Sequence, residues 1–250
     1  MKYVYTAAGF FIAIGLLMIK RAFENNLVTH KIKICEEPLK QPLKVLFISD
    51  IHRRKISAQW FSSLPEVDIV LIGGDITERG VPYERVRHNA ALLSHAGKAY
   101  FVFGNNDEEV NKNKLTSILE KEGIVVLEND SIEIESHQHI SIAGVGDVNY
   151  QQDNLNLALN DIKGENIILL SHDPRITRKL TNVSEASKVR VVLSGHTHGG
   201  QIRFFGFGPY DKGGLVHHHQ FSQLISNGYG TTLIPMRLGA KSEIHLIHFI

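Results

Sequence analysis

The sequence predicts an α+β protein in which two mixed β-sheets pack face to face and helices cover their outer faces, giving four layers in the order α/β/β/α. Short apolar runs alternate with helical patterns up to Gly123, and short strands separated by turn residues follow that glycine. A long uncharged apolar stretch at the N-terminus adds a separate element, for which we expect a transmembrane helix.

The uncharged stretch runs from Tyr3 to Ile19 and meets Lys20 and Arg21 at its end. A helix of this length covers about 25 Å, near the lower limit for a bilayer core. No small-residue cleavage site follows, so we expect an uncleaved anchor over residues 1–21 rather than a signal peptide or a buried core helix. The basic residues that follow predict a single-pass protein of the cell membrane with the rest of the chain in the cytoplasm.

The composition of the 250-residue chain is that of a globular protein with a real core, since 43% of its residues are hydrophobic and 21% are charged. The net charge of +1 argues against a nonspecific nucleic-acid binder, which would carry a clear excess of positive charge. Cys35 is the single cysteine, so no intrachain disulfide can form. We expect one large domain over residues 43–250, preceded by a tether and an edge strand over residues 22–42.

The secondary structure of this domain follows from the spacing of its apolar residues. Continuous apolar runs of four to eight residues indicate buried strands, and apolar positions at helical spacing indicate amphipathic helices. We expect strands over residues 29–34, 44–49, 67–72, 98–103, 124–127, 131–135, 139–144, 166–171, 189–194 and 242–250, and helices over residues 83–94, 111–122 and 154–162.

Metal-competent side chains follow five of the expected strands. In chain order they are Asp50 and His52, then Asp75, then Asn105, then His172, and finally His196 and His198. An alternating pair can place both side chains on one side of an extended backbone, and neighbouring glycines allow close approach. Each motif alone is more often a turn or a chance pattern, but all five in this order predict one metal site.

The donor set defines the class of metal. Carboxylate, imidazole and amide ligands suit Mn²⁺, Zn²⁺ or Fe²⁺, with Mn²⁺ favoured, whereas a structural zinc site would favour cysteines. One aspartate bridging two such ions about 3.5–4 Å apart would make a two-metal hydrolase.

These residues resemble the calcineurin-like metallophosphoesterases, whose motifs read D-x-H, G-D, G-N-H-D/E, a lone His and G-H-x-H. The resemblance covers residues 43 to 250. The strings GHTHGGQIRFFGFGP and LIPMRLGAKSEIHLIHF are similar to a membrane-associated bacterial branch, some members of which act on the UDP-2,3-diacylglucosamine intermediate of lipid A synthesis. The resemblance implies a β-sandwich flanked by helices, in agreement with the expected elements.

The resemblance also implies the role of each ligand. The first metal would be held by Asp50, His52, Asp75 and His198, and the second by Asp75, Asn105, His172 and His196. A hydroxide between the ions would attack phosphorus in line with the leaving group. Asp75, which would bridge the ions, and Asn106 are then the candidate catalytic residues.

The sequence departs from the family pattern at Asn106, where the family carries a histidine that protonates the leaving group and contacts the phosphate. Asparagine can donate a hydrogen bond but cannot release a proton. General acid catalysis is worth roughly 10²–10⁴ in rate, so the loss matters most for poor alkoxide leaving groups. We therefore expect an active enzyme biased towards anhydrides or activated esters.

Other residues are weaker candidates. Asn106, Arg53 and Arg54 are the expected substrate contacts, although a solvated loop explains the two arginines equally well. Arg175 is a further candidate for contact with an anionic substrate, and Asp147 is a further candidate for a position near the metals. We expect His217, His218 and His219 to lie in an exposed loop, and Trp60 and Phe61 to belong to a helix core or a hydrophobic lip.

We expect the substrate to be a phosphorylated small molecule or a lipid-linked phosphate, such as a membrane- or envelope-related phosphodiester or pyrophosphate. The alternatives are a catalytically impaired metal-binding scaffold, in which Asn106 has removed activity, and a nuclease. A nuclease needs a basic groove that the composition does not indicate.

Overall fold

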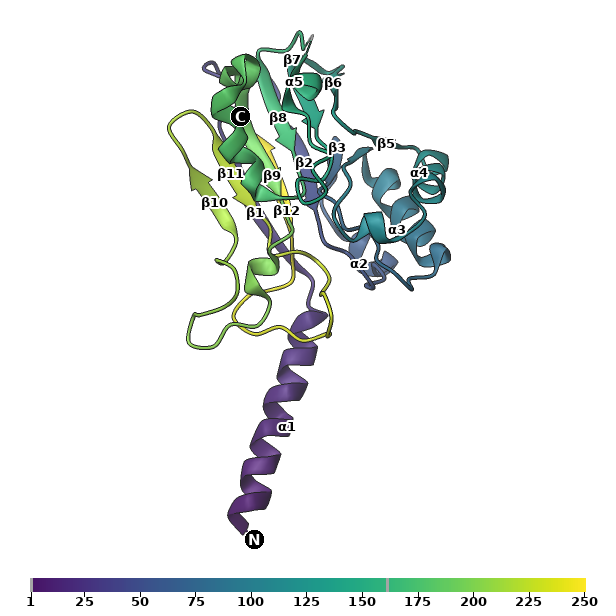
Figure 1. Cartoon of the computed structure of the whole chain (residues 1–250), viewed down its shortest axis with the longest axis vertical. Coiled ribbons are helices and arrows are strands. Elements are labelled where there is room, and N and C mark those ends of the chain that lie inside the picture. The colour runs from purple at the N-terminus through teal and green to yellow at the C-terminus, as the bar shows by residue number, and fades with distance from the viewer. Residues whose placement is uncertain (1, 161) are drawn as a thin grey trace.

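Two six-stranded sheets pack face to face in the computed structural model, and a single long helix projects from one end of them (Figure 1). The structure describes residues 2–160 and 162–250, without the side chains of residues 2–4, 7 and 8. The first sheet has the order β1 (Asn26–Ile32), β12 (Glu243–Phe249), β2 (Leu43–Ile48), β3 (Ile69–Ile72), β4 (Lys98–Phe101) and β5 (Ile124–Val126). Only the pairing of β12 with β2 is antiparallel there.

The second sheet has the order β10 (Gly214–His217), β11 (Ser222–Ile225), β9 (Val189–Ser194), β8 (Asn166–Leu170), β7 (His137–Gly144) and β6 (Asp130–Ile134). Its four central strands are parallel, and the two outer strands pair antiparallel. The helices are α1 (Lys2–Ala22), α2 (Ala58–Phe61), α3 (Tyr83–Ala96), α4 (Lys112–Lys121) and α5 (Leu155–Leu159), with 3₁₀ helices η1 (Asp107–Glu109), η2 (Pro174–Asn182), η3 (Ser184–Lys188) and η4 (His198–Gly200).

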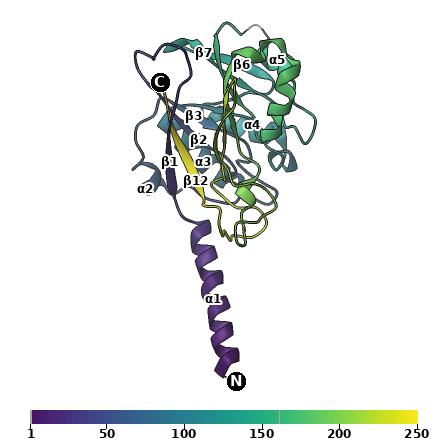
Figure 2. The same ribbon diagram turned by 90° about the vertical axis from the view of Figure 1, so that its left-hand side faces the viewer.

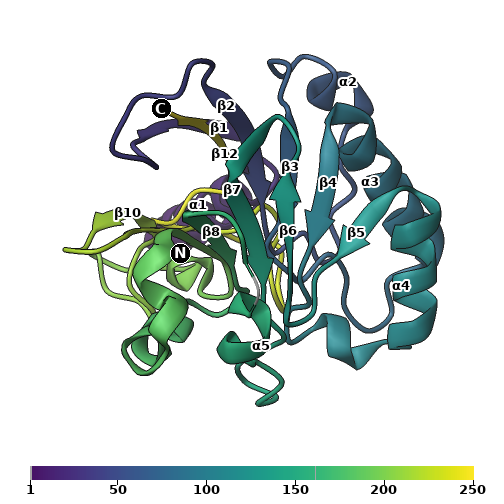
Figure 3. The same cartoon turned by 90° about the horizontal axis from the view of Figure 1, so that it is seen from above.

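Apolar side chains bury both faces of each sheet. On β2, Val45 and Phe47 join the core between the sheets, whereas Leu46 and Ile48 join the core under α2, α3 and α4, because successive side chains point to opposite faces. Residues of α5 and η2 cover the outer face of the second sheet. The four layers predicted from the sequence are therefore present, and Figure 3 shows α3 and α4 outside β3, β4 and β5.

The predicted strands all form, with ends that differ by at most three residues, and β1 is an edge strand. The predicted helix over residues 154–162 is shorter, since α5 ends at Leu159, and residue 161 lies outside the described residues. β10 and β11 were not predicted. Each has only four residues, and β10 is largely exposed, so its apolar pattern is weak.

Helix α1 coincides with the predicted anchor, although Met1 lies outside the described residues. It stands away from the sandwich in both side views (Figure 2), and Phe10, Phe11, Ile12 and Leu16 are exposed on it. No helix in the described part of the chain is both long enough and apolar enough to span a bilayer. The transmembrane span expected over residues 3–19 is therefore not supported.

The C-terminal end of α1 is fixed to the sandwich by a buried arginine. The Arg54 guanidinium donates to the carbonyls of Ala22, Phe23 and Glu24, at 3.4, 2.8 and 3.0 Å. Ala22 is the last residue of α1, and its carbonyl is one of the groups that a helix end leaves without an intrahelical partner. Phe23 and Glu24 follow it directly. The guanidinium also lies 3.8 Å from the centre of the Tyr229 ring. The orientation of α1 is thus set by the body of the domain.

A buried histidine pair makes the stability of the sandwich depend on pH. His245 of β12 has its Nδ1 3.1 Å from the Nε2 of His30 on the neighbouring β1. Burial, with a smaller contribution from His30, lowers the pKa of His245 to about 3. The unfolded chain therefore binds a proton at His245 from about pH 6.5 downwards, whereas the folded chain stays neutral there.

We predict that the free energy of unfolding of the metal-free protein falls by roughly 2 kcal/mol between pH 6.5 and pH 5 through this residue. Urea titrations in EDTA at several pH values measure it. His245→Leu should flatten this part of the profile, and His139→Leu, at an exposed site on β7, should leave the slope unchanged. An equal slope in wild type and His245→Leu would contradict the assignment.

Candidate metal centre

The metal-competent residues meet where parallel strands end. Ile48, Ile72 and Phe101 pair in register at the ends of β2, β3 and β4, and Leu170 pairs with Leu193 at the ends of β8 and β9. The loops that follow carry all seven ligands expected from the sequence, which are Asp50, His52, Asp75, Asn105, His172, His196 and His198. Because the carboxyl ends of parallel strands share one edge, these loops converge.

Most of these ligands have an unusual backbone conformation. Asp50, His52, Asp75, His196 and His198 have φ values of 54°, 50°, 53°, 70° and 50°. Left-handed conformations are uncommon outside glycine and cost about 1–2 kcal/mol each. The surrounding structure must therefore hold these residues in place, and such strain concentrates at functional sites.

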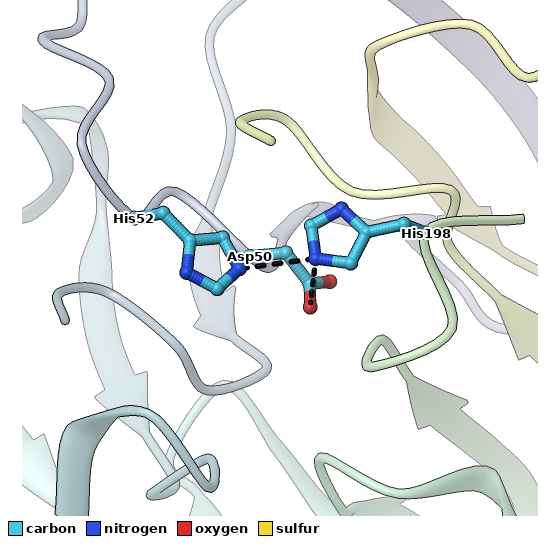
Figure 4. Close-up of side chains that lie close together, drawn as sticks. All are labelled: Asp50, His52 and His198. Carbon is cyan, nitrogen blue, oxygen red and sulfur yellow. Dashed lines mark hydrogen bonds and ion pairs between the residues drawn. The ribbon is translucent and has the colours of Figure 1, made fainter. Parts of the chain in front are cut away.

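The first group of ligands is almost completely buried and tightly packed (Figure 4). The Nε2 atoms of His52 and His198 are 3.0 Å apart, and His198 Nε2 is 3.4 Å from Asp50 Oδ1. His52 Nε2 also lies 3.6 Å from Asp75 Oδ2. Two imidazole nitrogens and two carboxylates thus face one point.

The second group lies beside the first and shares Asp75 with it. His172 Nε2 is 3.4 Å from Asp75 Oδ2, the same oxygen that approaches His52. Asn105 Oδ1 lies 3.2 Å from His172 Nε2 and 2.8 Å from His196 Nδ1. Asp75 therefore stands between the two groups, in the position expected of a bridging ligand.

The spacing of these atoms fits metal coordination. Ligands about 2.1 Å from an ion are roughly 3.0–3.5 Å apart in octahedral or tetrahedral geometry. Carboxylate, imidazole and amide oxygen are donors that divalent ions of the Mn²⁺, Fe²⁺ and Zn²⁺ class accept. The ligand atoms of Asp50, His52 and His198, and those of Asp50, Asp75 and His172, lie within 4.8 Å of one another. Asp50 thus belongs to the surroundings of both groups.

Glycines beside the ligands allow this close packing. A Cβ on Gly104 would lie 2.3 Å from Asp75 Oδ1 and 2.8 Å from His172 Nδ1. A Cβ on Gly195 would lie 2.3 Å from Asp50 Oδ2. These two positions need glycine because the ligand carboxylates occupy the space of a side chain.

Burial and charge act in opposite directions on the central pair. Burial alone would raise the pKa of Asp75 and lower that of His172. The attraction and hydrogen bond between them outweigh burial, so the pKa of Asp75 is lowered and that of His172 is raised well above its ordinary value. At His198 burial outweighs the attraction of the nearby Asp50 carboxylate and lowers the pKa to about 3. A site so rich in acceptor atoms suits a cation.

Glu78 orients His52, a role that the sequence did not indicate. Its Oε2 lies 3.0 Å from His52 Nδ1, and its other oxygen accepts from Arg53 Nε. A proton held on Nδ1 leaves the Nε2 lone pair free for a metal. Glu78 follows Asp75 by three residues in an ordinary loop, and only the tertiary structure brings it to His52.

Asp107 fastens two of the ligand loops together. Its carboxylate accepts from the backbone N–H groups of Asp75, Thr77 and Gly104, at 2.6, 3.1 and 2.9 Å. Burial and the nearby charge of Asp75 raise the pKa of Asp107 to about 8, despite these backbone donors. It is the last residue of the third motif, and the structure gives it a role in shaping the site.

Arg237 fixes the loop that carries His198, as Asp107 fixes the loops of Asp75 and Gly104. Its side chain is fully buried and donates to the carbonyls of Asn227 and Gly230, at 2.6 and 2.7 Å. Its Nη2 lies 3.2 Å from His198 Nδ1. Burial lowers its pKa to about 10, so it remains charged at neutral pH. No sequence pattern indicates this role for Arg237, since its contacts are tertiary.

Asn106 lines an open cleft of about 450 Å³ that also includes members of both ligand groups. Its backbone N–H and its Nδ2 donate to the two oxygens of Asp75, at 2.8 and 2.7 Å. Ile202, Leu233 and Ile234 line the same cleft. The side chain is thus placed beside both the bridging carboxylate and the space available to a substrate.

The remaining candidates fall into place around this site. Arg53 is exposed and pairs with Glu78. The prediction that Arg54 contacts the substrate is wrong, because its guanidinium is buried against the end of α1.

Asp147 braces a turn by accepting from the N–H groups of Asn149 and Tyr150, and Arg175 pairs with buried Asp173. His217, His218 and His219 are exposed, as predicted, and Phe61 is buried in the helix core.

The fold and the site together define a class of protein, an α/β/β/α metal-dependent hydrolase with its ligands on strand-end loops. The model of the calcineurin-like phosphoesterase family matches residues 43–200, and the chain belongs to that family. It is a phosphoester hydrolase, and this confirms the expectation drawn from the motifs.

Several known proteins are similar to the chain. An uncharacterised protein of Bacillus subtilis, YpbG, is 42% identical over 239 residues, which are 92% of this chain and 90% of that protein. A metallophosphoesterase of the same organism, YkoQ, is 29% identical over 83% of each chain. A 5′-nucleotidase precursor of Thermus thermophilus has the same fold, with a TM-score of 0.52, 14% identity, and coverage of 83% of this chain and 55% of that chain.

We predict that Glu78→Ala lowers Mn²⁺ affinity about 10–100-fold, since outer hydrogen bonds to ligand histidines have effects of this size. Isothermal titration of the metal-free protein measures it. Glu78→Gln keeps an acceptor for His52 Nδ1 and should recover most of the affinity, whereas Glu84→Gln, at an exposed carboxylate of α3, should change nothing. Wild-type affinity in Glu78→Ala would show that His52 needs no partner.

Proposed function

We propose that the protein is a two-metal phosphoesterase that hydrolyses a phosphoanhydride or an activated phosphodiester, with a lipid-linked phosphate as its substrate class. The observation that carries the two-metal proposal is the position of Asp75 Oδ2, which lies 3.6 Å from a ligand of the first group and 3.4 Å from one of the second. Mn²⁺ is the favoured ion from the type of ligands.

The candidate ligands would hold the two ions, and Asn106 and Arg53 would contact the substrate. Asp50, His52 and His198 would hold one ion, Asn105, His172 and His196 would hold the other, and Asp75 would touch both. Two ions bound there would activate a water and stabilise charge on the phosphoryl oxygens. Asn106 would donate its amide hydrogen bond to a phosphoryl or leaving-group oxygen in the adjoining cleft, and Arg53 would offer positive charge at the rim.

The chemistry of Asn106 supports a bias in the leaving group. A poor alkoxide leaving group needs a proton as the bond to phosphorus breaks, and an amide cannot supply one. A phosphate, nucleotide or phenolate leaves readily as an anion. The site therefore favours anhydrides and activated esters over simple alkyl esters.

The walls of the site support an amphiphilic substrate. The cleft above Asn106 has an apolar wall of Ile202, Pro209, Leu233 and Ile234. A second cleft of about 490 Å³ adjoins it across His196 and Tyr210 and is lined by Arg178, Lys212 and Asp211, among others. An apolar chain suits the first cleft, and a polar group with an anionic charge suits the second.

The exposed surface of α1 supports association with a membrane. Helix α1 exposes apolar side chains, and Lys20 and Arg21 stand between them and the domain. We place the catalytic domain at the cytoplasmic face of the cell membrane, because basic residues flank apolar segments on that side. A lipid-linked substrate would then reach the cleft without leaving the bilayer surface.

Two other functions are less well supported. A scaffold without activity would explain the loss of the family histidine, but the seven candidate metal ligands still converge on one site, which supports activity. A nuclease would need a basic groove, and the net charge of the chain is only +1.

We predict that Asp75→Asn abolishes hydrolysis of bis-p-nitrophenyl phosphate by the Mn²⁺-loaded protein, since removing the bridging charge weakens both metal positions. Release of p-nitrophenolate measures turnover, and circular dichroism verifies that the variant is folded. Asp147→Asn, a buried aspartate outside the ligand groups, should retain most of the activity. Metal binding by the wild type without any turnover would favour the scaffold instead.

We predict that Asn106→His raises turnover of a dialkyl phosphodiester at least about tenfold and changes turnover of bis-p-nitrophenyl phosphate little. Only the alkyl leaving group needs the added proton donor. Parallel assays of the two esters give the ratio of their turnover rates directly. Asn113→His, at an exposed site of α4, serves as the control. An equal change for both esters would contradict the proposed role.

A further inference from the structure

Two loops near the cleft display large apolar side chains to solvent. Phe204, Phe205 and Phe207 lie between η4 and β10, with exposed fractions of 61%, 101% and 81%. Leu233 and Ile234 lie between β11 and β12, with exposed fractions of 95% and 48%. Contiguous exposed apolar surface is rare on soluble monomers and marks a binding surface.

Both loops are built to hold these side chains outwards. Phe204 and Phe207 exchange two backbone hydrogen bonds of 2.9 Å, which close a tight turn with Phe205 and Gly206 at its tip. Phe205 has a φ of 50° and Leu233 a φ of 61°, conformations that are costly for bulky residues. The N–H of Ile234 donates to the carbonyl of Thr232 at 2.7 Å across Leu233. Strained backbone that is held in place points to function.

Polar side chains brace the two loops and join them. The Arg203 guanidinium donates to the carbonyls of Gly199, Gly206 and Tyr210, and so fixes the turn of the first loop. The Gln201 side chain donates to the carbonyls of Thr232 and Ile234, at 3.1 and 3.2 Å. The exposed tips therefore belong to one ordered surface.

This surface lies at the end of the molecule from which α1 projects. Figures 1 and 2 both place the two loops beside the C-terminal turn of α1, and the N–H of Arg237 donates to the carbonyl of Met18 at 3.0 Å. Leu233 and Ile234 also line the cleft at the metal ligands. The helix α1, the tips of the two loops and the mouth of the cleft therefore lie at the same end of the molecule.

The exposed side chains of α1 identify the partner that fits this end. Phe10, Phe11 and Ile12 are consecutive and all exposed, so they point in directions about 100° apart around the helix. A protein groove would need a single apolar stripe, whereas hydrocarbon accepts side chains on every side. Lys20 and Arg21 in the last turn match anionic headgroups.

We propose that the loop tips at Phe205 and Phe207 and at Leu233 form a second membrane contact, which dips into a lipid bilayer beside α1 and sets the mouth of the catalytic cleft on the bilayer surface. With α1 as the single contact, the helix and the domain fixed to it could tilt together on the bilayer. With the loop tips, the attachment has three points, and the apolar wall of the cleft is continuous with the surface that meets the acyl chains. This extends the proposed function, but the contact itself needs neither metal nor turnover.

The test uses tryptophan as a reporter in the full-length chain, with the only native tryptophan removed by Trp60→Phe. Phe205→Trp is compared with Leu157→Trp, an exposed site on α5 far from α1 in Figures 1 and 2. The probe is vesicles of phosphatidylcholine with a minority of phosphatidylglycerol, and the quencher is a lipid brominated on its acyl chains. We expect a blue shift and strong quenching at position 205 and neither at position 157.

A second measurement asks whether the contact contributes to binding. Phe205→Ser combined with Phe207→Ser should lower partition of the full chain into these vesicles about 100-fold, and Leu157→Ser should not. Hydrolysis of soluble bis-p-nitrophenyl phosphate should be unchanged in all of them, which separates this proposal from the catalytic one. Unshifted emission at position 205 in vesicle-bound protein would overturn the proposal. So would a lipid-free dimer that the serine pair converts to a monomer.

Discussion

The site depends on one constraint, which is that five metal-competent residues are held in left-handed backbone conformations at the ends of strands. Asp50, His52, Asp75, His196 and His198 would relax to commoner conformations in a free chain. Two parallel strand blocks, joined face to face, fix where each loop begins. Asp107 and Arg237 then hold the loops by hydrogen bonds to backbone groups on both sides of the site. The cost of the strained residues is thus offset by packing far from the metals.

The burial of the ligands has an electrostatic consequence. Carboxylates and imidazoles are packed closely here, and several of their acceptor atoms face one another, although His52 pairs with Glu78 and His172 with Asp75. A divalent cation would satisfy the acceptor atoms, so metal binding and the stability of the site are linked. The same arrangement explains why glycine is needed at Gly104 and Gly195, where ligand oxygens fill the space of a side chain.

Much of the fold and the ligand set could be predicted from the sequence, because both are local signals. Apolar runs such as that of β2 predict buried strands, and the polar residues directly after them share one edge of a sheet. Glu78 and Arg237 could not be found in this way, since they reach the site only through tertiary contacts. The substrate contact expected of Arg54 rested on its closeness to His52 in the sequence, which does not determine where a side chain points. The Arg54 guanidinium instead contacts the end of α1.

Electron paramagnetic resonance of the Mn²⁺-loaded protein tests most directly whether Asp75 bridges two metal ions. We expect a signal from two exchange-coupled ions in wild-type protein and loss of the coupling in Asp75→Asn. A wild-type spectrum of isolated, uncoupled Mn²⁺ at full loading would contradict it.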